Sequence, residues 1–258
     1  MDMNFENATV TVSIHPQLME YMDNRRAMKK RPINYKKGEK QTVYPIKKHE
    51  DIVAMANWLY QNKDHKYLLA FILGINLGLR ANELLTLRMN QVFNKDGSVR
   101  FVADVEDTSD RIDIYQSKTH KYRTVFLNSA CVDALHWYFG MLMNTDGGVC
   151  LYSDDYLFPS REGGAIEVNT FRKVLKEAAH ACGLNQNIGT HTLRKTWGWH
   201  QYRYNCNKAN LDITMLQRAF GHSSGEVTLR YLGITDEEDK ALYHDMCINP
   251  ISDEKFGF

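Results

Sequence analysis

The sequence predicts an α+β fold that is mainly helical and contains one small antiparallel sheet of three strands. Apolar residues recur at helical spacing through most of the chain from His49 onward. This pattern changes once, between residues 99 and 128, to the alternation that is typical of half-buried strands. We find no internal repeat and no low-complexity segment, so we expect one mainly helical domain.

The first helices precede the sheet. HEDIVAMANWLYQNK, which begins at His49, places Ile52, Met55 and Leu59 at helical spacing. KYLLAFILGINLG is predicted to form a mostly buried helix that ends at Gly78, and ANELLTLRMNQV is predicted to form a third helix.

The strands and the later helices follow in order. VRFVADV, RIDIYQSK and KYRTVFLN are predicted to be three short antiparallel strands, with the last turn at THK. Helices are then predicted at SACVDALHWYFGMLM, NTFRKVLKEAAHAC, THTLRKTWGWHQYR and DITMLQRAFG. Asn169 is expected to cap the second of these four helices, Gly183 to end it, and Gly221 to end the fourth.

Three regions are predicted along the chain. Residues 1–44 are expected to form a weakly structured basic arm or linker, with at most a short helix over Gln17–Lys30. Residues 45–234 are expected to form the folded domain. Residues 235–258 are expected to form an acidic tail.

Composition limits the class of protein. The chain has 258 residues, of which 43% are hydrophobic and 24% are charged, as in an ordinary soluble globular protein. No apolar run approaches the roughly 18 residues that span a membrane, and the start MDMNFENATVTVSIHP lacks the features of a secretory signal. The five cysteines are scattered and never in CxxC spacing, so we expect reduced thiols, a cytoplasmic protein and no metal site.

Charge is segregated along the chain, although the formal net charge is only +1. Residues 24–48 contain ten Lys or Arg and one Glu, and residues 172–218 contain eight Lys or Arg and two acidic residues. The last segment, residues 235–258, contains two Lys and seven acidic residues. The basic blocks favour a polyanionic partner, although the first block alone is equally consistent with a solvated arm.

Two stretches place a strong hydrogen-bond donor beside a helix end. In GLRANELL, Arg80 follows a helix-ending glycine, and Glu83 lies three positions later, where it can hold the guanidinium once a helix starts. In GTHTLRKTW, His191 and Arg194 share a face in the first turn of a helix, where backbone N–H groups favour an anion.

Two further stretches carry groups that are suited to chemistry. In QSKTHKYRTVFL, Lys118 lies at the edge of a hairpin turn. In GHSSGEVTLRYLGI, His222 follows a helix-ending glycine and precedes Tyr231 by nine positions. Each of these stretches alone is more often structural than functional, because an exposed ion pair or a half-buried tyrosine is common in any fold.

The order and spacing of these residues resemble the tyrosine recombinases, the phage integrase family of site-specific DNA recombinases. GLRANELLTL is similar to the first-arginine box of that family, SKTHKYRTVFL to its lysine hairpin, and HTLRKTW to its H-x-L-R box. LQRAFGHSSGEVTLRYLGI is similar to its final stretch, in which the nucleophilic tyrosine follows a histidine by nine residues. The resemblance covers about residues 45–234, and it fills all six catalytic positions: Arg80, Lys118, His191, Arg194, His222 and Tyr231.

The resemblance implies the catalytic-domain fold of the family and a reaction that needs no metal ion, ATP or other cofactor. Tyr231 would attack a DNA phosphorus and form a 3′-phosphotyrosyl bond, which conserves the energy needed to rejoin the strand. Lys118 would protonate the departing 5′ oxygen, and His191 would help to move the proton of the tyrosine.

The remaining groups would bind the phosphate. Arg80 and Arg194 would hold its oxygens with planar, permanently charged guanidinium groups, and His222 would add a further donor. Glu83 would support Arg80. Basic residues of the arm, the hairpin and the later helices are expected to contact the DNA backbone: Arg25, Arg26, Lys29, Lys30, Arg31, Lys36, Lys37, Lys121, Arg123, Arg172, Lys173 and Lys195.

Double-stranded DNA is therefore the expected partner, and the resemblance implies a homo-oligomer, expected to be a tetramer, on that DNA. The acidic tail is a candidate for docking on a neighbouring protomer. A helix that packs on its own domain, or a disordered tail, is an equally good expectation. Only about 45 residues precede the catalytic domain, too few for the separate core-binding domain that is usual in the family. An accessory or partner recombinase, or a shortened chain, would account for the difference.

Some positions depart from the family pattern, and two other functions stay open. Lys195 stands where a second His is frequent, and Phe126 stands where Pro is usual. A type IB topoisomerase uses the same pocket to relax supercoils, and a DNA-binding regulator can keep the fold without the activity. The regulator would be marked by the loss of one of the six groups, and none is lost. Neither the DNA target nor the choice between integration, excision and inversion is indicated.

Overall fold

The fold is described from a computed structural model, which describes residues 42–100, 112–116, 121–143, 150–206 and 213–234. The chain divides into two compact units, residues 1–197 and residues 198–258, and each is described by itself. The predicted architecture is confirmed, because helices dominate and the strands form one small antiparallel sheet. None of the helices in these ranges is long and apolar enough to cross a membrane.

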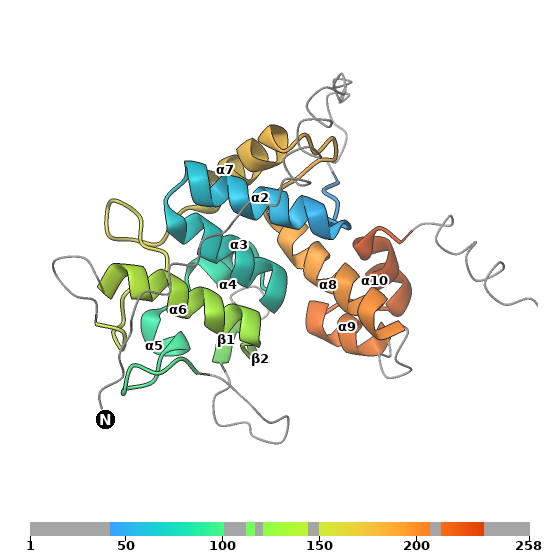
Figure 1. The fold of residues 1–258 in the computed structure, drawn as a ribbon. Coiled ribbons are helices and arrows are strands. Elements are labelled where there is room, and N and C mark those ends of the chain that lie inside the picture. The colour runs from blue at the N-terminus through green and yellow to red at the C-terminus, as the bar shows by residue number, and fades with distance from the viewer. Residues whose placement is uncertain (1–41, 101–111, 117–120, 144–149, 207–212, 235–258) are drawn as a thin grey trace, which may run out of the picture. The chain divides into compact units, whose positions relative to one another are not determined.

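The first unit is built around the apolar helix α3 (His65–Leu77). Helices α2 (His49–Asn62) and α6 (Ser129–Met143) both pack against α3, and α7 (Val168–Ala181) packs against α2 (Figure 1). An ion pair of 2.5 Å between Lys63 and Glu177 joins α2 to α7. Helix α8 (Thr190–Cys206) begins in this unit and continues into the second one.

Helix ends fall where glycines predicted them. Gly78, Gly183 and Gly221 follow α3, α7 and α9 (Ile213–Phe220), with φ of 59°, 72° and 70°. These left-handed conformations are typical of glycines that end helices. The cap predicted at Asn169 is wrong, because α7 begins at Val168, and Glu167 takes the N-cap position without a side-chain hydrogen bond.

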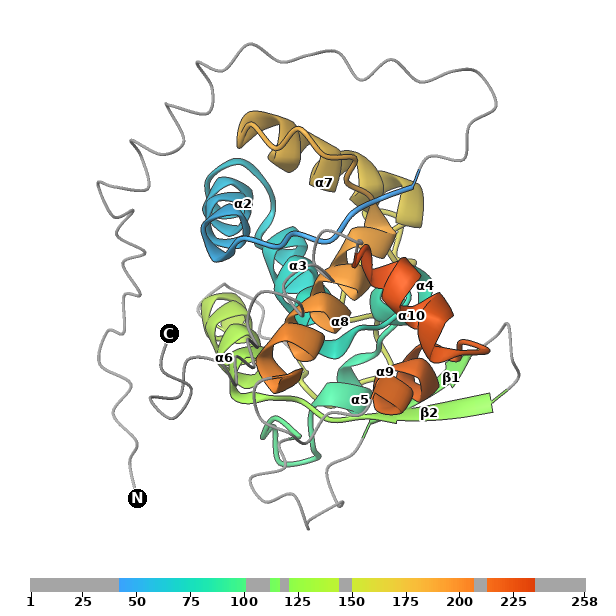
Figure 2. The ribbon, with the colours of Figure 1, turned by 90° about the vertical axis from the view of Figure 1, so that its right-hand side faces the viewer.

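The sheet has two strands within the described residues, rather than the three that were predicted. Strands β1 (Ile112–Gln116) and β2 (Lys121–Val125) pair antiparallel, with Ile112 opposite Val125 (Figure 2). The first predicted strand, VRFVADV, begins differently, because Val99 bridges to Phe93. Its residues from Phe101 onward lie outside the described ranges, as does the helix predicted over 17–30.

The third predicted helix is two short helices, α4 (Ala81–Leu85) and α5 (Met89–Val92). Leu87 and Met89 exchange backbone hydrogen bonds with Leu157 and Asp155, and Arg88 bridges to Tyr156. This strand-like pairing interrupts the helix, and it depends on a segment almost 70 residues away, which helical spacing does not detect.

The second unit contains α9 and α10 (Gly225–Leu232), which pack against each other. Helix α10 was not predicted, although its signals are local. The Ser224 side chain accepts a hydrogen bond from the backbone N–H of Val227, and Gly233 ends the helix with φ of 72°. Tyr231 therefore lies in the last turn of a short helix that is capped at both ends.

Candidate active site

The turn after α3 carries Arg80. The Arg80 backbone N–H donates to Glu83 Oε2 at 2.9 Å, and Arg80 Nη1 donates to Glu83 Oε1 at 2.6 Å, so the predicted pair is present. The Glu83 side chain is 7% exposed, whereas the Arg80 side chain is 28% exposed. The pair therefore presents its guanidinium, and not its carboxylate, toward solvent.

Helix α8 brings Arg194 to the same turn. His191 and Arg194 lie in the first turns of this helix, and Arg194 Nη1 donates to the carbonyl oxygen of Gly78. The start of α8 is fastened by Thr192, whose hydroxyl accepts a hydrogen bond from the backbone N–H of Gly189 at 3.1 Å. Two arginines from distant parts of the sequence are thus gathered around residues 78–80.

Arg123, on β2, joins this group. Its Nη1 lies 3.3 Å from the Gly78 carbonyl oxygen, and its Nη2 lies 3.5 Å from the Leu77 carbonyl oxygen. Burial lowers the pKa of Arg123, and the charge of Arg80 lowers it further, while the Glu83 carboxylate opposes both effects. Arg123 was predicted to contact DNA. In the structure, both of its terminal nitrogens already donate to backbone carbonyl oxygens.

His191 lies in the field of these cations. The surrounding protein desolvates the imidazole, and this lowers its pKa; the charges of Arg194, Lys195 and Arg80 lower the pKa further. The side chain still keeps an exposed face. At neutral pH the ring is therefore uncharged, which is the form that can accept a proton. Lys195, a predicted DNA contact, is only 6% exposed, and this burial lowers its pKa.

We predict that His191 titrates below the ordinary histidine value of 6.5 in the free protein. The neutral ring should persist as pH falls through 6.5, because three neighbouring cations oppose protonation. A proton NMR titration of the ring measures the midpoint. Lys195→Gln should raise the midpoint, and Lys173→Gln, which removes an exposed cation from α7, should leave it unchanged. A midpoint at or above 6.5 in the unmodified protein would contradict the prediction.

In the second unit, His222 and Tyr231 lie side by side. Their ring centroids are 4.9 Å apart, and Phe220 lies 5.2 Å from each of them, stacked on His222 and tilted against Tyr231. The nine-residue spacing therefore consists of a short turn and one helix that returns the phenol to the imidazole. Phe220, which the sequence analysis did not single out, supports both rings.

Thr228 orients the His222 ring. His222 Nδ1 lies 3.1 Å from Thr228 Oγ1, and the Thr228 hydroxyl donates to the Ser224 carbonyl oxygen at 3.1 Å. The contact between Nδ1 and Oγ1 fixes the orientation of the imidazole ring. Either nitrogen of that ring can carry the proton, since the Thr228 hydroxyl can donate or accept.

The rings of the second unit rest on Gly198 in α8. A Cβ at this position would lie 2.4 Å from Phe220 Cζ and 2.7 Å from Leu232 Cδ2. Glycine costs a helix interior roughly 1 kcal/mol relative to alanine. Here that cost is accepted because any side chain would overlap two buried residues.

We predict that Gly198→Ala destabilises the protein by about 1–3 kcal/mol, because overpacking outweighs the gain in helix propensity. Thermal unfolding should show a melting temperature lower by about 2–4 °C for each kcal/mol. The matched control is Gly140→Ala in α6, where a Cβ meets nothing within 4 Å. The control should be neutral or slightly stabilising, and an equal response of the two variants would refute the packing argument.

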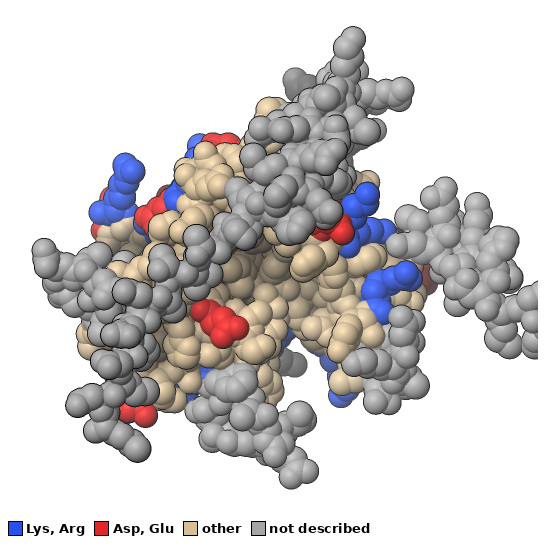
Figure 3. Space-filling model, viewed as in Figure 1, with Lys and Arg blue, Asp and Glu red and all other residues tan. Residues whose placement is uncertain are grey.

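Of the remaining predicted residues, some lie within the described ranges and the others lie outside them. Arg172 and Lys173 are exposed on α7, as a backbone contact requires. Figure 3 shows lysines, arginines and acidic residues among the described residues of one face. Lys121 begins β2. The other predicted residues lie outside the described ranges: Arg25, Arg26, Lys29, Lys30, Arg31, Lys36, Lys37 and Lys118.

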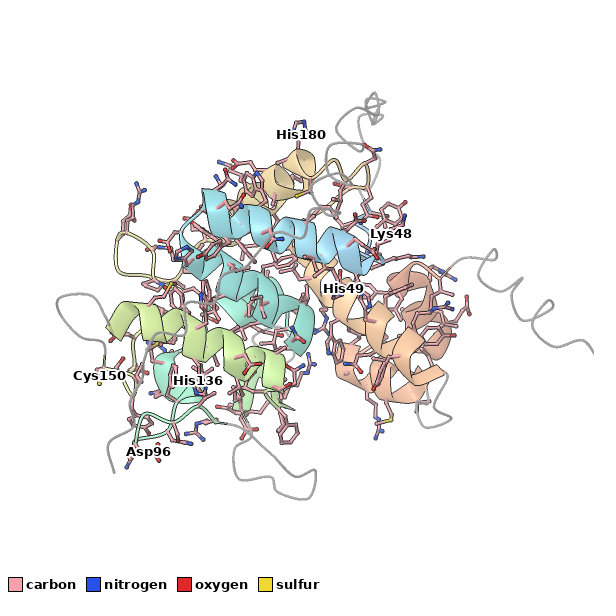
Figure 4. The ribbon with its side chains drawn as sticks, in the orientation of Figure 1. Lys48, His49, Asp96, His136, Cys150 and His180 are labelled. Atoms are coloured by element: carbon pink, nitrogen blue, oxygen red, sulfur yellow. The ribbon has the colours of Figure 1, made fainter. Side chains whose placement is uncertain are left out.

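No metal centre is formed by the residues that the structure describes, since no three His, Cys, Asp or Glu side chains are grouped suitably for one. Figure 4 shows His136 on α6, His180 at the end of α7 and Cys150 well apart from one another. The turn at residues 78–80 has arginines and a histidine around it, and Glu83 is the carboxylate that pairs with Arg80.

Comparison with known proteins identifies the family of this chain. The profile of the phage integrase family matches residues 45–238. The probable integrase/recombinase YoeC of Bacillus subtilis (strain 168) is 34% identical over 202 residues, which cover 78% of this chain and 95% of YoeC. Tyrosine recombinase XerC of Caldanaerobacter subterraneus subsp. tengcongensis is 28% identical over 196 residues, which cover 76% of this chain and 47% of XerC. The chain thus spans about half the length of XerC.

Solved structures have the same fold. The crystal structure of XerA recombinase aligns with a TM-score of 0.57 and 20% identity, and the alignment covers 81% of this chain and 68% of XerA. XerH bound to a palindromic difH substrate, in a post-cleavage complex, aligns with a TM-score of 0.56 and 18% identity, covering 83% of this chain and 56% of that one. The chain therefore belongs to the phage integrase family and carries the catalytic domain of a tyrosine recombinase.

Proposed function

We propose that the protein cuts and rejoins double-stranded DNA at specific sites through a 3′-phosphotyrosyl intermediate, without a metal ion or ATP. The observation that supports this most directly is the gathering of Arg80, Arg194 and His191 around the turn at residues 78–80. Two fixed guanidinium groups with a neutral imidazole beside them suit a phosphodiester, whose negative charge increases as the phosphorus is attacked.

The arginines provide the charge that a metal ion provides in other enzymes. Arg80 is held by Glu83, and Arg194 is held by the Gly78 carbonyl, so neither guanidinium must be reorganised when the phosphate binds. A preorganised donor of this kind is worth about 2.7–4 kcal/mol. The low exposure of Arg194 also strengthens its field, because less water screens it.

Tyr231 provides the nucleophile. A phenol with a pKa near ~10 must lose its proton as it attacks. Neutral His191 is suited to assist that transfer, and His222 is suited to donate a hydrogen bond to a non-bridging oxygen. Lys118 would protonate the departing 5′ oxygen. The bond between phosphorus and the 5′ oxygen is broken as the bond between phosphorus and the phenol oxygen forms.

The partner in this proposal is duplex DNA, and cutting on two duplexes would engage a homo-oligomer. XerH has been solved bound to its difH DNA, which supports a DNA partner for a chain of the same fold. Exposed Arg172 and Lys173 would contact the backbone, together with the arm residues named above. Residues 45–234 would act as the catalytic domain, and residues 235–258 as a docking segment on a neighbouring copy.

The test uses nicked duplexes tiled across the DNA that flanks the gene, incubated with the full chain in EDTA and without ATP. Cutting next to the nick releases a short fragment, so the covalent complex is trapped and is seen on a denaturing gel. Mass spectrometry of the nuclease-treated adduct should place the nucleotide on Tyr231. Retarded DNA with no adduct on any duplex would instead indicate a DNA-binding regulator. Relaxation of a plasmid that lacks the cut site would indicate a topoisomerase.

A further inference from the structure

We propose that Arg123 is a positioning residue for the phosphate-binding arginines, and that it does not itself contact DNA. This inference depends on the function proposed above. Arg123 would fix the carbonyl end of α3, and through the Gly78 carbonyl it would set the position of Arg194 beside Arg80.

The carbonyl end of α3 needs cations from elsewhere. The last carbonyls of a helix have no partner within the helix, and the helix dipole makes this end negative. Helix α3 has no basic residue in its last turn. Arg123 reaches the carbonyls of Leu77 and Gly78 from β2, and Arg194 reaches the Gly78 carbonyl from α8. Two guanidinium groups therefore share one acceptor, two residues before Arg80.

Trp197 holds this arrangement together. The Arg123 guanidinium carbon lies 5.9 Å from the centroid of the Trp197 ring, within the range of a cation–π contact. The same ring lies against Gly78, where a Cβ would come within 2.3 Å of ring atom Cε3. Gly78 also has φ of 59°, so a side chain there would be both strained and excluded. The carbonyl that the two arginines share is therefore held rigidly.

The electrostatic relations agree with a supporting role. The charges of Arg80 and Glu83 both act on Arg123, which places it next to the predicted pair. Arg123 is only partly exposed, and two of its N–H groups are directed at backbone oxygens. A phosphate that took either of these two N–H groups would break a bond that holds the turn.

The test measures single-turnover cleavage of the nicked duplex at saturating protein, together with DNA affinity as a function of salt. Arg123→Met keeps the side-chain stem but removes the guanidinium and with it both bonds to the α3 carbonyls, and the saturated rate should fall about 10²-fold through displacement of Arg194 and Arg80. Affinity and its salt dependence should equal those of Arg161→Gln, which removes one exposed charge from the loop before α7. In an Arg194→Met background, Arg123→Met should have little further effect, because the two act together.

Several outcomes would overturn the inference. Weaker affinity, a salt slope lower by about 1 and an unchanged saturated rate would show that Arg123 contacts a phosphate. Full additivity with Arg194→Met would show that the two arginines act separately. If Arg123→Met lowers the melting temperature, Arg123→Lys replaces it: one charged donor is kept, and the saturated rate should fall about fivefold. An unchanged rate in Arg123→Lys would also contradict the proposal. Absence of any adduct with the unmodified chain would instead count against the proposed function.

Discussion

Tyr231→Phe is expected to abolish the covalent protein–DNA adduct while DNA binding is kept. The substitution removes only the phenol oxygen, which is the atom that would bond to phosphorus. The ring can remain where it is, because its packing against the rings of His222 and Phe220 is kept in phenylalanine. Stability should change by less than about 1 kcal/mol.

The measurement is the denaturing gel with the nicked duplex, run beside a binding assay on the same DNA. Tyr44→Phe is the matched control, since Tyr44 is a half-exposed tyrosine of the first unit. The control should form the adduct at the normal rate. An adduct that persists in Tyr231→Phe would show that another residue is the nucleophile, and the proposed mechanism would then be wrong.

Arg80→Ala is expected to lower the rate of adduct formation about 10²–10³-fold, the usual loss for one preorganised donor to a developing charge. It should also lower stability, because the carboxylate of Glu83 is almost fully buried and would lose the guanidinium that neutralises it. An unsatisfied buried group of this kind costs about 1–3 kcal/mol.

A second substitution separates the two effects. Adding Glu83→Gln to Arg80→Ala removes the buried charge, so the melting temperature should recover while the cleavage rate stays low. Single-turnover rates and thermal unfolding are measured on the same preparations. A cleavage rate that recovers together with stability would mean that Arg80 supports the fold and does not bind the phosphate. A rate for Arg80→Ala within about threefold of the unmodified chain would lead to the same conclusion.

The helices and their ends were largely predictable, because their causes are local. The apolar spacing of α2, α3 and α6 and the glycines after α3, α7 and α9 depend on residues within a few positions of one another. The prediction of one long third helix was wrong because Leu87–Met89 pairs with a distant segment near Tyr156. The first predicted strand begins differently for a local reason, since Val99 bridges to Phe93, six residues before it.

The same division holds for the candidate site. Arg80 with Glu83, and His191 with Arg194, are neighbours on one helical face, so their spacing alone indicates that they act together. The order of the boxes was specific enough to indicate the family, which the comparisons confirm. Phe220 and Thr228 lie near His222 in the chain, but nothing in their spacing distinguishes them from ordinary packing residues.

Which chemical groups this protein has, and in what order, follows from its residues alone, since a guanidinium or a phenol keeps its chemistry in any fold. Which groups touch was decided by packing between distant segments. Arg123 has the same charge as the arm arginines and was grouped with them as a DNA contact. Only the folded chain places it on the carbonyl end of α3, beside Arg194 and over Trp197. The physical reason is that a helix end without its own basic residue attracts cations from whichever elements lie nearest in space.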